Sequence, residues 1–155
     1  MTNIDYNKQG YIELLRLKYL QKKILTSNEE TELNKYLYML EKSLDWETKD
    51  QYVSLLKSFL SGKINSFTFY IKFKEQNDLN TEAFHSLKAN FILLSPQEQS
   101  KSFSAFINAI IHFCYSYSEV FGLELPQETR DSYELDFCNF MEKVNFKIQS
   151  FLNKE

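Results

Sequence analysis

The sequence contains few residues that interrupt regular structure. Only 3 of its 155 residues are glycine and 2 are proline. Both are well below ordinary usage, so the chain can form few tight turns. Folds built from β-strands need many turns and helical folds need few, so this scarcity favours helices. The 14 phenylalanines and 10 tyrosines exclude disorder, because a chain this rich in apolar side chains can offset its ordering entropy by burial.

A long apolar run and a disulfide framework are both missing. No stretch reaches the roughly 18 apolar residues of a membrane span; the best candidate, Ala105 to Tyr117, contains Asn108 and His112. The segment Met1 to Gly10 is polar and lacks the apolar core of a signal peptide. Two cysteines are too few for a disulfide framework. We therefore expect no membrane partner and a reducing, cytoplasmic compartment, with an organellar stroma as the alternative.

No motif for catalysis or metal binding is visible either. The thiol and imidazole side chains are His85, His112, Cys114 and Cys138, and no pair has CxxC or HExxH spacing. Both cysteines fall in apolar stripes, where burial raises the pKa of a thiol and lowers its reactivity. We expect no catalytic residue, no metal, no cofactor and no enzymatic activity. A histidine beside a carboxylate or thiol in a cleft would revive the enzyme interpretation.

Apolar residues at helical spacing recur along the chain and predict an all-α fold. We expect a single-domain bundle of about six to seven mostly antiparallel helices over residues 1–155. Residues 1–44 would form an N-terminal helical hairpin and residues 45–155 a helical core. The expected helices cover about residues 8–24, 27–44, 45–61, 66–74, 81–94, 96–120 and 131–152.

Capping residues mark several of these helix ends. Thr26 and Glu29 have capping-box spacing before the second helix. Asp45 is the expected N-cap of the third helix, and Gly62 stands where a glycine with positive φ should end it. A serine, a proline and a glutamate within residues 95–98 mark the start of the sixth helix.

The stretch from Ser66 to Lys74 has two interpretations. Its apolar residues alternate with other residues, as in a β-strand: Phe67, Phe69, Ile71 and Phe73. A helix with Ser66 as N-cap would place Phe67, Tyr70, Ile71 and Lys74 on one face. We predict a helix, because a lone strand would have no obvious partner elsewhere in the chain.

The charge is unevenly distributed. The net charge of −3 and the pI of about 5.5 argue against direct nucleic-acid binding, whose footprint is normally basic. Residues 1–23 carry five basic and two acidic side chains, whereas residues 119–142 carry seven acidic side chains and one basic one. Such an acidic segment is either a solvated face or a surface for a basic protein partner. Its candidate partner-binding residues are Glu124, Glu128, Asp131, Glu134 and Asp136.

Residues 52–64, with the sequence YVSLLKSFLSGKI, are followed by Phe69 and Phe73. This pattern resembles the bacterial self-protective colicin-like immunity family. The segment Glu82 to Leu87 and the acidic stretch before the last helix extend the resemblance over about residues 52–152, whereas the first fifty residues have no counterpart in it. The resemblance implies a small helical inhibitor of a cognate toxin, often a tRNA-cleaving nuclease. Its acidic side chains would occupy the basic cleft that holds RNA phosphates.

Two functions are compatible with these observations. The first is a non-catalytic protein-binding domain, an acidic immunity protein that inhibits a cognate toxin nuclease by covering its basic active site. The alternative is a helical accessory or adaptor subunit of a larger assembly, which would expose a contiguous apolar patch. Salt discriminates between them, because binding through exposed carboxylates weakens steeply as ionic strength rises. Neither the partner's identity nor the oligomeric state follows from the sequence.

Overall fold

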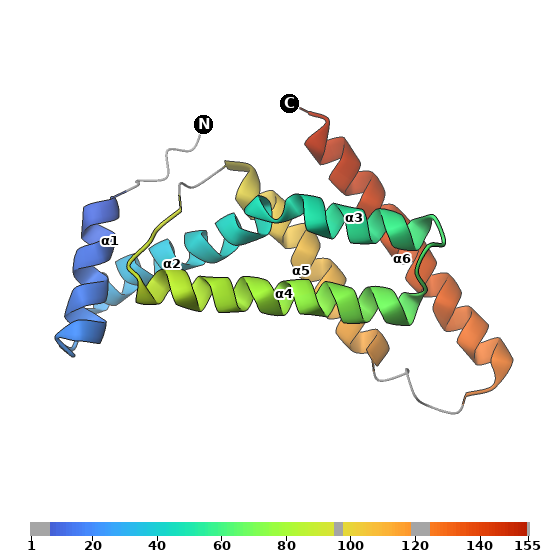
Figure 1. Ribbon diagram of the computed structural model, residues 1–155, viewed down its shortest axis with the longest axis horizontal. Coiled ribbons are helices and arrows are strands. Elements are labelled where there is room, and N and C mark those ends of the chain that lie inside the picture. The colour runs from blue at the N-terminus through green and yellow to red at the C-terminus, as the bar shows by residue number, and fades with distance from the viewer. Residues whose placement is uncertain (1–6, 95–97, 119–124, 155) are drawn as a thin grey trace. The chain divides into compact units, whose positions relative to one another are not determined.

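The computed structural model describes residues 7–94, 98–118 and 125–154. Within them the chain is helical and contains no β-strand. The helical elements (Figure 1) are α1 Lys8–Leu15, the π-helical segment η1 Arg16–Leu20, α2 Ser27–Glu47, α3 Lys49–Leu60, α4 Ser66–Ala89, α5 Glu98–Ser118 and α6 Gln127–Leu152. The predicted all-α fold with six to seven helices is confirmed. None of the helices in these ranges has the length and apolarity needed to cross a membrane.

The helices group into two compact units. Unit 1 comprises Met1–Glu47 and Asp78–Ser104, and unit 2 comprises Thr48–Asn77 and Ala105–Glu155. Each unit is therefore assembled from two separate stretches of sequence, and α4 and α5 contribute residues to both units. The N-terminal helices share unit 1 with the C-terminal part of α4. The predicted single domain, divided near residue 44, stays a prediction.

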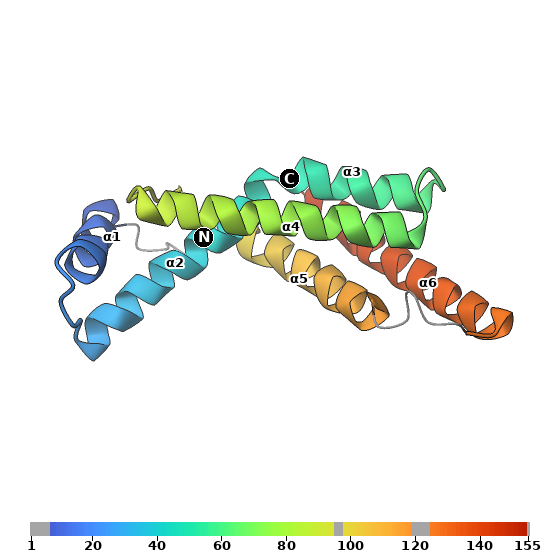
Figure 2. The same ribbon diagram turned by 60° about the horizontal axis from the view of Figure 1, so that its bottom comes forward.

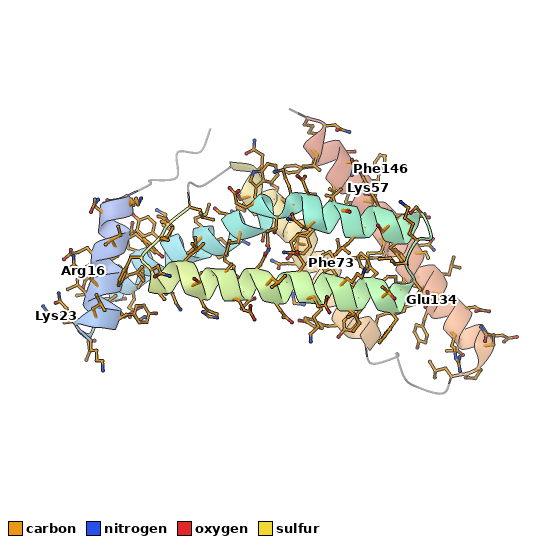
Figure 3. All side chains as sticks on the ribbon, in the orientation of Figure 1. Arg16, Lys23, Lys57, Phe73, Glu134 and Phe146 are labelled. Carbon is orange, nitrogen blue, oxygen red and sulfur yellow. The ribbon has the colours of Figure 1, made fainter. Side chains whose placement is uncertain are left out.

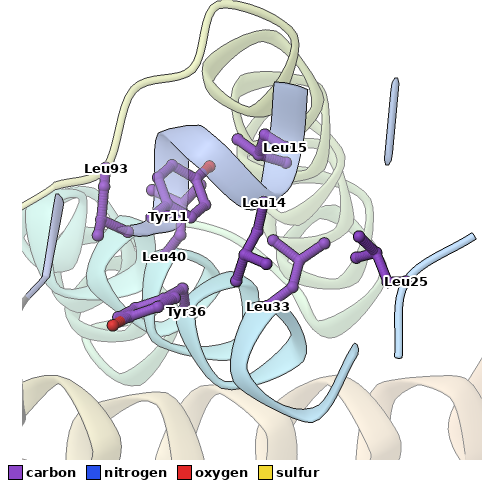
Figure 4. Packing of buried hydrophobic residues seen from close by; sticks show 8 residues of the cluster. All are labelled: Tyr11, Leu14, Leu15, Leu25, Leu33, Tyr36, Leu40 and Leu93. Atoms are coloured by element: carbon purple, nitrogen blue, oxygen red, sulfur yellow. The ribbon is translucent and has the colours of Figure 1, made fainter. Parts of the chain in front are cut away.

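The core of unit 1 is built from α1, α2 and the segment after α4. Its buried side chains (Figure 4) are Tyr11, Leu14, Leu15, Leu25, Leu33, Tyr36, Leu40 and Leu93. The rings of Tyr11 and Tyr36 meet edge to face with centroids 5.9 Å apart, an arrangement that aromatic pairs favour. The Tyr11 hydroxyl donates to the backbone oxygen of Ile92 over 3.4 Å. Apolar burial along α1 and α2 thus holds this unit together.

The predicted capping box before α2 is confirmed. The backbone amide of Glu29 donates to Thr26 Oγ1 over 3.2 Å, and the backbone amide of Thr26 donates to Glu29 Oε1 over 2.9 Å. Both side chains thereby satisfy amides that a helix start leaves without an intrahelical acceptor.

Thr26→Ala should therefore lower the free energy of unfolding by about 1 kcal/mol, the usual cost of losing an N-cap side chain. Thr31→Ala is the matched control, because the Thr31 hydroxyl only donates to Ser27 O inside the helix. Urea titrations followed by circular dichroism measure both changes. An equal effect of the two substitutions would contradict the capping role of Thr26.

Aromatic side chains form the core of unit 2. Phe69, Phe73 and Phe137 are fully buried. The Phe137 ring lies 5.2 Å from Phe59 and 4.8 Å from Tyr117, measured between centroids. Phe69 lies 5.4 Å from Phe59 and 5.3 Å from Phe73. Rings from α3, α4, α5 and α6 therefore pack as one cluster.

Residues 66–74 form a helix, as predicted, but the buried face is different from the expected one. Phe69 and Phe73 are buried, whereas Phe67 and Ile71 are exposed. The N-terminal cap is also different, because Asn65 Oδ1 accepts from the backbone amide of Thr68 over 2.8 Å. The aromatic cluster of unit 2 determines which face is buried. Residues four apart share one side of a helix, so Phe69 and Phe73 can both belong to the cluster.

The break predicted between residues 74 and 81 is absent. Helix α4 runs without interruption from Ser66 to Ala89 (Figure 1 and Figure 2), and no glycine or proline stands within it to end it. Two of the expected helices are therefore one. The helix start predicted within residues 95–98 falls mostly on residues 95–97, outside the described residues.

Helices α3 and α4 end with the same backbone hydrogen-bond pattern, although the residue with positive φ is a glycine after α3 and a phenylalanine after α4. At the end of α3, the amide of Gly62 donates to Phe59 O over 3.0 Å and the amide of Lys63 to Ser58 O over 2.9 Å. Gly62 has φ of 80°, so its predicted place as a glycine with positive φ after the helix is confirmed. The two hydrogen bonds are those of a Schellman motif. After α4, Phe91 takes the same place with φ of 58°, and the amide of Ile92 donates to Leu87 O over 2.9 Å.

Candidate functional site on helix α6

The acidic segment lies on α6, which begins earlier than predicted. The predicted last helix begins at about residue 131, with a loop before it, but α6 starts at Gln127, directly after Pro126 with φ of −55° and ψ of 148°. This extended backbone at a proline favours a helix start just after it. Glu128 and Arg130 are consequently helical and not part of a loop. Residues 123 and 124 lie outside the described residues.

Four of the five predicted partner-binding residues are placed, and the structure does not bring all four together. Glu128, Asp131, Glu134 and Asp136 are all exposed on α6, and Glu124 lies outside the described residues. With about 100° between successive residues of a helix, Glu128 and Asp131 lie on neighbouring lines along α6. Asp136 projects from another side, and Glu134 lies near the edge of the buried face.

The local contacts separate these carboxylates further. Glu134 Oε1 accepts from the buried Ser66 hydroxyl over 2.5 Å, which ties α6 to the start of α4 within unit 2. Asp131 Oδ1 accepts from the side-chain Nε2 of Gln127 one turn earlier over 2.9 Å. Glu128 has no bonded partner among the residues described. Glu128 and Asp131 are therefore more available to a partner than Glu134.

A regular strip of exposed residues follows the side of α6 opposite its buried face. We call it the outward strip, and it consists of Glu128, Asp131, Leu135, Asn139, Glu142 and Phe146. Its spacing of three and four residues keeps all six side chains on one side of the helix. Buried Phe137 and Val144 lie on the other side. Figure 3 labels Phe146 on this helix, together with Glu134.

Two large apolar side chains stand in this acidic strip. Leu135 is 61% exposed and Phe146 is 73% exposed. Leu135 does not belong to the buried stripe of α6, because Phe137 and Met141 set the face that packs inward. Phe146 and Glu142 were not singled out as site residues. The signal that could have identified them is the recurrence of exposed positions at intervals of three and four from Glu128.

The cysteines and histidines do not form a site among the described residues. No group of three or more His, Cys, Asp or Glu side chains there is arranged to hold a metal ion. Cys114 is buried in the core, and burial raises its thiol pKa to about 12. Burial, with a smaller effect from Glu134 and Glu142, also raises the pKa of Cys138. Thiols with raised pKa values are poor nucleophiles at neutral pH.

A buried polar cluster in unit 1 is the feature that the sequence interpretation missed. Asp45 was expected to cap the third helix, but it lies inside α2, and Thr48 precedes α3. Its side chain is buried. Asp45 Oδ2 accepts from the Ser104 hydroxyl over 2.6 Å, and Asp45 Oδ1 accepts from the side-chain Nδ2 of Asn80 over 3.1 Å. One carboxyl group thus joins α2, α4 and α5.

Burial raises the pKa of Asp45 above its usual value, although the hydrogen bonds from Ser104 and Asn80 oppose the shift. Beside it, the Trp46 ring meets Phe103 edge to face at 5.8 Å between centroids. The cluster is enclosed by packed side chains, so it holds helices together and offers no surface to a partner. The outward strip of α6 is therefore the better candidate for a functional surface.

Neither a family model, nor a curated protein, nor a solved structure matches this chain. The resemblance of residues 52–152 to the colicin-like immunity family is consequently a proposal. The outward strip and its charge are the features of this chain that point to a function.

Proposed function

We propose that this chain is a non-catalytic helical protein-binding domain that holds a basic protein partner on the outward strip of α6. The proposed partner is a toxin nuclease in the same reducing, cytoplasmic compartment, which the chain would inhibit as an immunity protein by covering its basic cleft. The observation that carries this proposal is the pairing of exposed carboxylates with two exposed apolar side chains on one helix face.

Charge supports a basic partner. Residues 127–142 contain five acidic side chains and one basic one, Arg130. The Arg130 Nε donates to the backbone oxygen of Leu125 over 3.0 Å, so this cation is directed toward the start of its own helix. An excess of one sign on an exposed face speeds the encounter with a partner of opposite sign and fixes its orientation. The basic cleft of a nuclease offers that complementary charge.

The apolar side chains supply what charge alone does not. Exposed ion pairs contribute little to affinity, typically below about 1 kcal/mol. Large apolar side chains that enter a pocket at the centre of an interface contribute far more. Leu135 and Phe146 are separated by eleven positions, or about 16 Å along a helix. Two anchors at this separation could both lie within one interface of ordinary size.

The same two side chains favour the alternative function. A helical accessory or adaptor subunit would dock through apolar contacts, with Leu135 and Phe146 as its anchors. Its complex would then depend little on ionic strength, because burial of apolar surface is not screened by salt. The two functions therefore differ in which side chains of the outward strip supply most of the affinity: the carboxylates for the immunity protein, and Leu135 and Phe146 for the adaptor.

Reversing charge on the strip should separate these functions. We expect Glu128→Lys/Asp131→Lys to weaken the partner complex by about 2 kcal/mol, or roughly 30-fold. Glu75→Lys/Asp78→Lys is the matched control, with the same charge change on exposed positions of α4. Wild-type and variant proteins serve as baits in a host lysate. The protein that the α6 variant loses and the control keeps is then purified, titrated at low and high salt, and assayed for RNA cleavage.

A basic nuclease whose activity the wild-type chain blocks, and whose binding falls with salt, supports the immunity function. If Leu135→Ser/Phe146→Ser abolishes binding while charge reversal and salt have no effect, the adaptor function is correct. Equal capture by all four baits would rule out the outward strip as the binding surface.

A further inference from the structure

The π-helical segment of unit 1 and the turn after it combine exposed apolar side chains with basic side chains. We call it the basic tip and define it as residues 16–24. Ile24 is 99% exposed and Leu20 is 62% exposed, with Tyr19 exposed beside them. Residues 16–24 contain four basic side chains and no acidic one. Figure 3 labels Arg16 and Lys23 near the C-terminal end of α1 and η1.

The backbone of the basic tip is fixed in an unusual shape. Segment η1 has the wider turns of a π-helix, a conformation that is rare and concentrated at functional sites. Lys22 follows with φ of 51°, which costs a residue with a side chain roughly 1 kcal/mol or more. The amide of Lys23 donates to Leu17 O over 2.9 Å and closes the turn. Leu25, directly after Ile24, is buried in the core of unit 1, so the tip is anchored on both sides.

The cations of the tip are mostly free. Lys18 Nζ pairs with Glu30 Oε2 at 2.9 Å, whereas Arg16, Lys22 and Lys23 have no acidic partner among the residues described. A further cation approaches from α4, because Lys88 Nζ lies 5.5 Å from the centroid of the Tyr19 ring. The tip therefore presents uncompensated positive charge around protruding apolar side chains, on a chain whose net charge is −3.

We propose that the basic tip docks on the surface of an anionic lipid bilayer, with Leu20 and Ile24 inserted between headgroups and Arg16, Lys22 and Lys23 against the phosphates. A bilayer accepts protruding apolar side chains without a shaped pocket, and basic residues beside them gain from the negative surface potential. Nucleic acid would use the cations but not the exposed Leu20 and Ile24. A protein would need a hollow that matches a side chain as exposed as Ile24.

This docking surface is independent of the proposed function, because it uses unit 1 and no residue of α6. The expectation of no membrane partner came from the lack of a spanning apolar run, and contact with a membrane surface requires no such run. Binding to vesicles therefore tests that expectation as well as this proposal.

Sedimentation with vesicles tests the proposal on the whole chain. Wild type should bind vesicles of phosphatidylcholine mixed with phosphatidylserine and not vesicles of phosphatidylcholine alone. Lys22→Glu/Lys23→Glu should weaken binding by about 30-fold, because each basic residue near an anionic surface contributes about fivefold. Leu20→Ser/Ile24→Ser should weaken it by about tenfold through lost apolar burial. Circular dichroism establishes that each variant keeps its helices.

Matched controls distinguish the tip from general charge and apolarity. Lys72→Glu/Lys74→Glu and Leu79→Ser change exposed residues of α4 and should leave binding within about twofold, since they lie outside the tip. The proposal is overturned if wild type ignores anionic vesicles, or if the tip variants bind them as well as wild type does. It is also overturned if poly(U) RNA or polyglutamate binds the tip at a salt concentration at which vesicles do not.

Discussion

Phe137→Ala is expected to lower the free energy of unfolding by about 3–5 kcal/mol, the usual cost of removing a fully buried aromatic ring. Phe137 is 0% exposed. Its ring contacts Phe59, Phe69, Phe113 and Tyr117, which belong to three other helices of unit 2. Alanine would leave a cavity lined by four rigid rings, which cannot collapse into the space as flexible side chains can.

Phe146→Ala is the matched control, on the same helix and with the same atoms removed. Its side chain is 73% exposed, so we expect its free energy of unfolding to change by less than about 0.5 kcal/mol. Urea titrations with tyrosine and tryptophan fluorescence measure both values. Similar losses for the two substitutions would show that the outward strip of α6 is packed rather than exposed, which would remove the basis of the proposed function.

Asp45→Ala should lower the free energy of unfolding by about 2 kcal/mol at pH 7. Two buried donors, the Ser104 hydroxyl and the Asn80 amide, lose the acceptor that they share. Each such loss costs about 1–3 kcal/mol, and relief from burying the carboxyl group offsets part of it. Ser104→Ala, which removes only one of the two bonds, should cost about half as much. Equal stability of Asp45→Ala and wild type would contradict a structural role for the cluster.

The pH dependence of stability offers a second measurement on Asp45. Because burial raises its pKa in the folded chain, the folded state keeps the proton at pH values where the unfolded chain has lost it. The resulting stabilisation is complete below the usual pKa of the side chain, 3.8, and is lost as pH rises through the raised value. Asp45→Asn cannot titrate, so its stability relative to wild type should increase from pH 4 to pH 7. Parallel pH profiles would show that Asp45 has an ordinary pKa.

Local signals in the sequence predicted the features that local chemistry determines. The capping box of Thr26 and Glu29 spans four residues, and the role of Gly62 depends on one backbone angle, so both could be identified without the fold. Asp45 has the same chemistry as an N-cap residue, and only the fold decides its place. Its partners Asn80 and Ser104 lie 35 and 59 residues further along the chain, a distance at which no periodicity carries information.

The candidate site was predictable in composition but not in geometry. The excess of acidic residues before the last helix is visible in the sequence, whereas the face that each residue occupies depends on where α6 starts and which side packs. The predicted start of this helix, at about residue 131, lies four residues after the observed start at Gln127. The prediction therefore left Glu128 outside the helix, whereas the residue is helical. The contact between Glu134 and Ser66 joins residues 68 positions apart. The sequence therefore could not show that this carboxylate accepts a hydrogen bond within the protein.

The interleaving of the two units has a consequence for synthesis on the ribosome. Residues 1–47 are translated before residues 78–104, which unit 1 also needs, so the apolar faces of α1 and α2 lack these neighbours while more than fifty further residues are translated. Unit 2 likewise needs residues 105–155 as well as residues 48–77. At ordinary translation speeds of roughly 5–20 residues per second, the nascent chain carries uncovered apolar helices for several seconds. Chaperones that hold such helices should therefore bind this protein during translation and release it only after residues 105–155 have been translated.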